Sequence, residues 1–302
     1  MTVYDLKTMQ ICEIRENTVV ALGFFDGCHA GHAAVFASCR ALAHKMGAKS
    51  AVYTFSTLPK NKDAKCIFSL DERIKAIRKS GVDYLCIEDF ESVMNLDASE
   101  FLEGVLCKKL HAIGACCGFN FKFGKGAVAN ASDLANFFQN RGGCVNICDK
   151  ILHRKSPLSS SLLRSFIEKG ELEALCEVAN PYSIYAIVEH GKELGRTIGI
   201  PTINQKIPQD KIVPARGVYI TECEIGEDVY PSITNVGVRP SVDENGQENI
   251  ETHIIGFSGN LYGSGVRVNF YKKIRDEKKF ESIALLKEEI EKNIQASIEF
   301  FK

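Results

Sequence analysis

Two histidines, separated by an alanine and a glycine, are the residues of this chain best placed to act on a phosphate group. They close the stretch Gly23-Phe-Phe-Asp-Gly-Cys-His-Ala-Gly-His32, which joins a β-rich apolar run to a segment with helical spacing. A strand that ends in glycines and opens into a helix presents backbone N–H groups and the positive helix end to a phosphate chain. His29 and His32 can then stabilise the charge that builds on an α-phosphate during transfer, without a protein nucleophile.

The plainer interpretation is that both histidines lie on the surface of a tight turn. Asp26, Gly27 and Gly31 argue against it, because glycines let the backbone approach a nucleotide and the pattern stands between an expected strand and an expected helix. Cys28 lies in the same stretch. A thiol near a helix N-terminus and histidines is expected to have a lowered pKa and raised reactivity.

A second set of residues suited to phosphate chemistry lies in Gly195-Arg-Thr-Ile-Gly-Ile-Pro-Thr-Ile-Asn204. Gly199 and Pro201 shape a loop, while Thr202 supplies a hydroxyl and Asn204 an amide oxygen. Mg²⁺ takes such oxygen ligands from a few side chains together with the phosphates of a nucleotide. A glycine-rich hairpin without a ligand is the alternative. Phosphorylation of a hydroxyl would also require a carboxylate close to the attacking oxygen.

The elements that must hold the first set alternate between strands and helices up to about residue 151. Helical spacing recurs over residues 35–46, and further helices are expected near Ser69, where Glu72 can complete a capping box, and near Ala98 and Ser132. The expected strands cover residues 18–23, 50–55, 84–87, 112–117 and 144–148. This order predicts a Rossmann-like, doubly wound, mainly parallel sheet with its ligand site at the carboxyl edge of the strands.

The pattern changes after a helical stretch over residues 161–179. Alternating segments at residues 182–188, 218–223, 251–255 and 266–270 predict an antiparallel β-barrel. A terminal helix over residues 282–301 is expected to pack on the barrel through an apolar stripe of Ile283, Leu286, Ile290, Ile294 and Phe301. A chain of 302 residues favours two cores, and the sequence predicts domains at 1–181 and 182–302.

The histidine stretch resembles the H-x-G-H signature of the nucleotidylyltransferase superfamily, and G-x-F-D-G-x-H-x-G-H resembles its FMN adenylyltransferase branch. Gly118-Phe-Asn-Phe-Lys-Phe-Gly124 is similar to the family's flavin-lining G-x-D/N-F-x-F-G, and Ser159-Ser-Ser-Leu-Leu-Arg164 is similar to its phosphate-binding S-S-T-x-I-R. The resemblance implies substrate-binding roles for Gly23, Phe25, Asp26, Gly31, Asn120, Phe121, Phe123, Ser160, Ser161 and Arg164, with His29 and His32 catalytic.

One departure from this branch concerns the flavin loop. In many members a Gly-Asp pair follows the aromatic stretch, whereas this chain has Ala129 and Asn130. The loss of a glycine and of a charge is expected to stiffen the loop and to weaken FMN capture.

The second phosphate stretch resembles the riboflavin kinase signature G-R-x-x-G-x-P-T-A-N, with Ile203 in place of the alanine. The resemblance implies that Thr202 and Asn204 hold Mg²⁺ and that Glu251 occupies the position of the catalytic base. Arg275 begins a segment that resembles the stretch closing over the isoalloxazine. The other residues implied in binding are Gly195, Arg196, Gly199, Pro201 and Asn235.

The resemblance spans residues 15–302 and implies a bifunctional enzyme. Riboflavin and ATP would give FMN at the barrel, and FMN and ATP would give FAD and pyrophosphate at the parallel sheet, both with Mg²⁺. The alternatives are a monofunctional flavokinase, a transferase for another nucleotide-like substrate, and a flavin- or nucleotide-binding regulator without activity.

Composition is that expected of a cytoplasmic enzyme acting on small molecules. A formal net charge of −1 without a long basic block argues against a nucleic-acid-binding surface. No apolar run approaches the length of a membrane span, and residues 1–5 lack a secretory pattern. The twelve cysteines are scattered without a C-x-x-C, so free thiols are favoured over zinc sites at Cys107 with His111, or at Cys144 with Cys148 and His153. The sequence indicates no oligomeric state.

Overall fold

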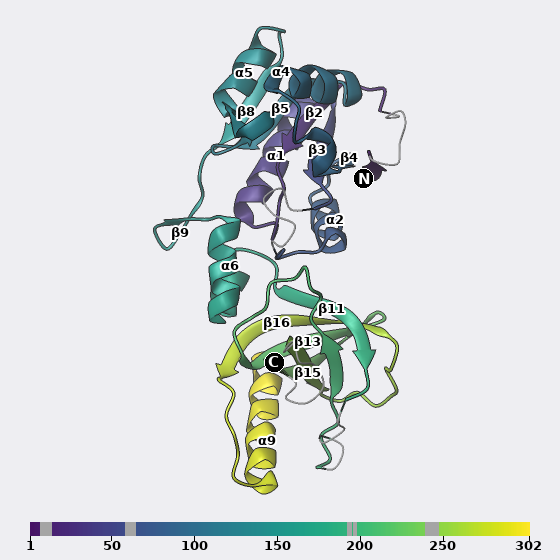
Figure 1. Ribbon diagram of the computed structural model, residues 1–302, viewed down its shortest axis with the longest axis vertical. Helices are drawn as coiled ribbons and strands as arrows, with labels where there is room; N and C mark the ends of the chain where they lie inside the picture. The colour runs from purple at the N-terminus through teal and green to yellow at the C-terminus, as the bar shows by residue number, and fades with distance from the viewer. Residues whose placement is uncertain (7–13, 58–64, 192–194, 196–197, 239–247) are drawn as a thin grey trace. The chain divides into compact units, whose positions relative to one another are not determined.

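The computed structural model describes residues 1–6, 14–57, 65–191, 195, 198–238 and 248–302. The chain forms two compact units, Met1–Ser160 and Ser161–Lys302. The first is built on a parallel sheet and the second on a closed barrel (Figure 1). The fold class predicted from the sequence is therefore confirmed.

The sheet of the first unit has six parallel strands in the order β1-β4-β3-β2-β5-β8. Five were expected: β2 (Thr18–Leu22), β3 (Lys49–Phe55), β4 (Tyr84–Glu88), β5 (Ala112–Gly118) and β8 (Cys144–Cys148). The sixth, β1 (Thr2–Asp5), pairs with β4 at the edge of the sheet. The sequence does not predict β1, because three of its four residues are exposed and leave no apolar run.

Helices cover both faces of this sheet. On β2, Val19 and Ala21 pack in one core with residues of α1 (Ala30–Lys45) and α2 (Leu70–Lys79). Val20 and Leu22 pack in the other core with residues of η1 (Phe101–Lys109), a π-helix, and α5 (Ala131–Gln139). The capping box predicted between Ser69 and Glu72 is present at the start of α2. The short elements are α3 (Phe90–Val93), α4 (Ala98–Glu100), β6 (Lys122–Phe123), η2 (Lys125–Ala127), β7 (Ala129–Asn130), β9 (Leu152–His153) and β10 (Ser156–Pro157).

The barrel of the second unit closes in the order β11-β12-β15-β14-β13-β16 with antiparallel pairing. Four strands were expected: β11 (Tyr182–Glu189), β13 (Gly217–Ile225), β15 (Glu248–Ile254) and β16 (Gly265–Arg275). The other two are β12 (Ile203–Lys206) and β14 (Asp228–Val238).

The strand β14 lacks an apolar pattern because the barrel interior contains hydroxyl groups. Thr221 Oγ1 lies 2.7 Å from Ser232 Oγ and 2.8 Å from Thr234 Oγ1, which in turn lies 2.9 Å from Thr252 Oγ1. All four side chains are fully buried. Because they satisfy one another, burying them avoids the penalty of unpaired polar groups.

Two helices precede the barrel where one was expected over residues 161–179. These are α6 (Ser160–Lys169) and α7 (Leu172–Cys176), and the break falls at Gly170, whose φ is +76°. Cys176 at the end of α7 bonds the Phe270 carbonyl of β16, and Lys272 forms an ion pair with Glu173. The domain boundary at residue 181 stays a prediction.

The last helix, α9 (Ile283–Phe300), packs against β13 and β14. The apolar stripe predicted for it is wrong in part, since Ile283 is 65% exposed and the buried residues are Asn293 and Ser297. Ser297 donates a hydrogen bond of 3.0 Å to the Ser232 carbonyl on β14. The other four residues of the stripe, Leu286, Ile290, Ile294 and Phe301, are half-buried, and the Phe301 ring lies 5.2 Å from that of Tyr271 on β16. The helix therefore meets the barrel through part of the predicted stripe together with polar contacts that apolar spacing does not reveal.

Candidate active sites

The turn between β2 and α1 is tightly wound and fixed by a buried carboxylate. Phe25, Gly27 and Cys28 have φ values of 60°, 77° and 38°, so three residues of this short turn adopt left-handed backbone. The Asp26 carboxylate is 2% exposed. It accepts hydrogen bonds of 2.9–3.2 Å from the backbone N–H groups of Ile67 and Phe68, just before α2. Asp26 therefore shapes the turn rather than presenting a free charge to a ligand.

The two histidines lie together at the start of α1. Their rings stack with centroids 3.7 Å apart. His29 is the N-cap, and its Nδ1 accepts a bond of 3.1 Å from the Gly31 N–H. A Cβ on residue 31 would lie 2.9 Å from the His29 ring, so only glycine fits there.

Burial keeps both imidazoles neutral at pH 7. It lowers the pKa of His29 to about 4 and that of His32 well below its ordinary value. Because His29 Nδ1 is an acceptor, the ring proton lies on Nε2, which is left as a donor. His32 Nδ1 is buried and has no hydrogen-bond partner within the described part of the chain. The pair thus offers ring nitrogens that a phosphate can engage.

A buried arginine that the sequence motifs do not include supports this turn. Arg73 on α2 donates to the carbonyls of Phe24, Phe55 and Ser56, at 2.9–3.2 Å, and to Thr54 Oγ1. Its guanidinium also lies 4.2 Å from the centroid of the Phe24 ring. The helical pattern around Arg73 gives no sign of these contacts, because all its partners lie elsewhere in the sequence.

The aromatic stretch predicted for flavin leaves the same edge of the sheet as the histidines. β5 is the neighbour of β2, with Leu22 opposite Cys117, so both chain segments emerge side by side. Asn120 is exposed, whereas Phe121 is half-buried and its ring stacks on Phe123 at 5.8 Å. Phe123 itself is 6% exposed and belongs to the core.

The serine-rich motif begins at the same turn. Ser160 Oγ donates a bond of 2.9 Å to the Asp26 carbonyl. Ser161 and Arg164 follow on α6, within the second unit.

In the barrel, strand register brings three predicted residues into one row. Asn204 on β12 pairs with Glu251 on β15, and Glu251 pairs with Asn235 on β14. Side chains of paired residues leave the sheet on the same side. Because Ile250 and Thr252 point into the core, Glu251 lies on the outer face of the barrel between two amide side chains.

The loop before β12 lies against this row. Gly195 O accepts bonds from Ile198 N–H and Ile200 N–H, one on each side of Gly199. A Cβ on Gly191 would lie 2.2 Å from the Asn204 amide nitrogen, so the backbone there covers Asn204 closely. Arg196 lies outside the described residues. Thr202 is half-buried beside the start of β12.

The end of β16 and the residues that follow it lie beyond the Asn235 end of this row. Arg275 stands opposite Val218, which stands opposite Asn235. Its Nε lies 3.4 Å from Glu289 on α9, and Asn235 Nδ2 donates to Glu277 Oε1 at 3.2 Å. Glu277 is a contact that motif reasoning does not anticipate.

Comparison with known proteins matches each unit to a flavin enzyme. Residues 11–162 match the FAD synthetase family, and residues 178–301 match the riboflavin kinase family. A Bacillus subtilis protein named bifunctional riboflavin kinase/FMN adenylyltransferase is 33% identical, over 96% of this chain and 95% of its own length. The chain belongs to this bifunctional family. Its Escherichia coli K12 member is 31% identical, over 95% of this chain and 94% of its own length.

A solved structure supports the same fold for the whole family member. A crystal structure from Streptococcus pneumoniae, described as a macrolide-efflux protein, matches with a TM-score of 0.89 and 30% identity. The match covers 98% of this chain and 99% of that one.

The departure of this family member at Ala129 and Asn130 has a structural explanation. Ala129 on β7 is 7% exposed and packs in the core. Asn130 is the N-cap of α5 and forms a capping box with Asp133. Asn and Asp cap helices about equally well, so the structure gives no reason for the weakened FMN capture expected from the sequence.

We therefore expect restoration of the family's Gly-Asp pair to cost stability without improving FMN binding. Ala129→Gly should lower the free energy of unfolding by about 1 kcal/mol, through lost packing and added chain entropy. Asn130→Asp should change it by only a few tenths of a kcal/mol. Urea unfolding and the KM for FMN measure both effects, and a clearly lower KM in the double variant would contradict this view.

The lowered pKa predicted for the Cys28 thiol is wrong, because the structure indicates a shift in the opposite direction. Burial raises the pKa of Cys28 to about 12, and its Sγ donates to the Phe25 carbonyl at 3.2 Å. Desolvation of the thiolate outweighs the nearby helix N-terminus.

At pH 7.5, N-ethylmaleimide should therefore inactivate FAD synthesis at the same rate in wild type and Cys28→Ser. ATP-protected labelling of Cys28 would show that the thiol is accessible and ionised after all.

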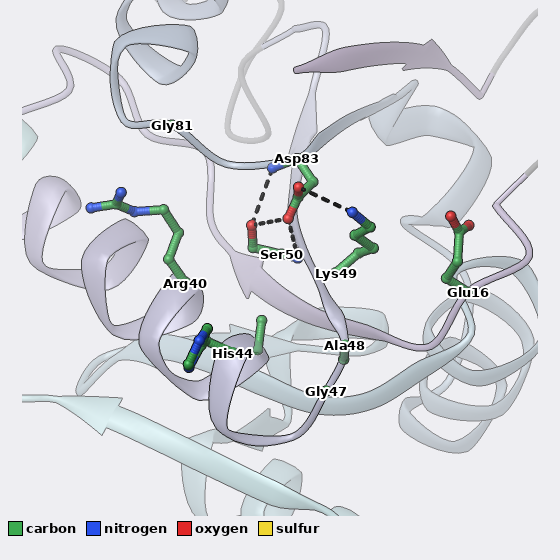
Figure 2. Close-up of a pocket in the computed structure, with 10 residues that line it drawn as sticks. Glu16, Arg40, His44, Gly47, Ala48, Lys49, Ser50, Gly81 and Asp83 are labelled. Atoms are coloured by element: carbon green, nitrogen blue, oxygen red, sulfur yellow. Dashed lines mark hydrogen bonds and ion pairs between the residues drawn. The ribbon is translucent and has the colours of Figure 1, made fainter.

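One cavity of the first unit lies at the edge of the sheet opposite the histidines. This cavity, of about 460 Å³, opens at the amino edge of the sheet, beside the segments entering β2, β3 and β4. Its Asp83 already binds Ser50 and Lys49, and it contains no predicted site residue (Figure 2). The eleven described cysteines form no disulfide, and the described residues include no cluster of three His, Cys, Asp or Glu that could hold a metal. Among the helices of the described ranges, none could span a membrane.

Proposed function

We propose that this chain makes FAD from riboflavin in two ATP-dependent steps at two separate sites. The barrel unit phosphorylates riboflavin to FMN, and the parallel-sheet unit adenylylates FMN and releases pyrophosphate. The observation that carries the proposal is that each candidate site lies within the region that matches the corresponding enzyme family. The stacked histidines lie within the region matched as FAD synthetase, and the Asn204–Glu251–Asn235 row lies within the region matched as riboflavin kinase.

In the adenylyltransferase site, His29 and His32 contact the ATP phosphates. The two neutral rings are held in place by the stack and by the N-cap bond. Preorganised donors of this kind stabilise charge on the α-phosphate as the FMN phosphate attacks it. Ser160, Ser161 and Arg164 are proposed to bind phosphate oxygens, and Asn120 and Phe121 to contact the flavin.

In the kinase site, Glu251 accepts the proton of the ribityl hydroxyl as that oxygen attacks the γ-phosphate. Asn204 on the adjoining strand offers an amide oxygen and Thr202, just before that strand, offers a hydroxyl. This donor set suits Mg²⁺. The ion would draw charge from the ATP phosphates. Arg275 and Asn235 are proposed to order the segment that meets the flavin.

Two points of the sequence interpretation remain part of the proposal. We keep 1–181 and 182–302 as the catalytic domains. A cytoplasmic location is proposed because the free thiols and the ATP requirement suit a reducing compartment. The efflux activity named for the pneumococcal structure is not carried over, because both family matches are to flavin enzymes.

Product analysis tests the proposal. Incubation with riboflavin, ATP and Mg²⁺ should give FMN first and FAD after it, as resolved by chromatography. If the products stop at FMN, the chain is a monofunctional kinase. If riboflavin is not consumed, the chain is a binding protein without activity.

A further inference from the structure

His253 ties the loop that contains Thr202 to the strand that contains Glu251. It lies on β15 two residues after Glu251, and therefore on the same outer face of the barrel. Its Nδ1 is 2.7 Å from the carbonyl oxygen of Pro201. A carbonyl oxygen can only accept, so Nδ1 must carry a proton and donate it.

This bond holds the carbonyl of Pro201, the residue just before Thr202. Ile203 is the first residue of β12 and pairs with Thr252, while Asn204 pairs with Glu251. Continuing that register by one residue sets Thr202 opposite His253. Thr202 is thus restrained on one side by strand pairing and on the other by the bond to the Pro201 carbonyl.

Among the described residues of the loop, the backbone bonds do not provide this restraint. They join Gly195 to Ile198 and Ile200, and not to β15. Pro201 lacks an N–H group and cannot extend the β12 ladder as a donor. Within the described residues, the bond from His253 to the Pro201 carbonyl connects the end of the loop to the strand of the proposed base.

We propose that His253 is a positioning residue of the kinase site, which sets the Thr202 hydroxyl against Asn204 and Glu251 by holding the Pro201 carbonyl. This inference rests on the proposed kinase function. Because a small displacement of a phosphate-binding group slows transfer strongly, removing the donor should impair MgATP use more than riboflavin binding.

Three substitutions isolate the donor. His253→Asn places an amide N–H where Nδ1 lies, His253→Gln places it farther out, and His253→Leu keeps similar size without a donor. We expect Leu and Gln to lower kcat/KM for MgATP in riboflavin phosphorylation about tenfold, as for a lost hydrogen bond. The Asn variant should stay within about threefold of wild type. FAD formation from supplied FMN should be unchanged in all three and reports that the chain is folded.

The comparison of variants decides the inference. Equal losses in Asn and Leu, a loss confined to the KM for riboflavin, or no loss would each overturn it. If Leu alone fails to fold, Gln against Asn carries the same comparison. Glu251→Gln, measured in parallel, tests the proposed function itself. A wild-type protein without kinase activity would overturn both the proposed function and the role of His253. An inactive Glu251→Gln beside a fully active His253→Leu would overturn only the role of His253.

Discussion

Replacing Glu251 by Gln will nearly abolish phosphorylation of riboflavin and leave the adenylylation of added FMN intact. Gln keeps the size and polarity of the side chain between Asn204 and Asn235 but cannot accept a proton. General-base catalysis contributes about 10²–10⁴ in rate, so a loss of that order is expected in kcat for FMN formation.

Glu248 provides a matched control for this experiment. It lies on the same strand and pairs with Arg216 at 3.3 Å, away from the paired amides. Glu248→Gln should therefore retain most of the kinase activity. The assignment of the base fails if Glu251→Gln stays active, and the separation of sites fails if a folded Glu251→Gln cannot make FAD from FMN.

Removal of the two histidine donors will stop the second step and cause FMN to accumulate. His29→Asn keeps an acceptor at the N-cap of α1 but lacks the ring Nε2, and His32→Ala removes the stacked partner. Loss of a preorganised stabiliser typically lowers rate by about 10²–10³, so the double variant should make almost no FAD. Its riboflavin kinase rate should match wild type.

His44 is the control for the histidine variants. It is exposed near the other end of α1 and lines the amino-edge cavity. His44→Ala should make FAD at the wild-type rate. Retained FAD synthesis in His29→Asn/His32→Ala, measured from supplied FMN, would contradict the assigned role.

Much of the fold could be predicted because apolar strands alternate with helical segments along the first unit. The buried strands of the parallel sheet appear as continuous runs, and each is separated from the next by a helical segment. The strand β1 is exposed at an edge, and β14 buries Ser232 and Thr234 in a hydroxyl network, so neither has the expected pattern. The buried face of α9 is likewise polar at Asn293 and Ser297.

The candidate sites were predictable where a motif is continuous in sequence. His29 and His32 belong to one short stretch, and the structure stacks them. Arg73 and His253 act through backbone carbonyls distant in sequence, which only the folded chain reveals. For Cys28 the sequence shows the helix start, whereas the degree of burial, which decides the pKa, depends on tertiary packing.

Transfer of label from ATP tests the central claim, that one chain performs two chemically different transfers, most directly. The protein is incubated with riboflavin, Mg²⁺ and ATP labelled either in the γ-phosphate or in the α-phosphate, and the flavins are separated. The account predicts γ-label in both FMN and FAD, and α-label in FAD alone. Absence of α-label from every flavin, while FMN takes up γ-label, would contradict it.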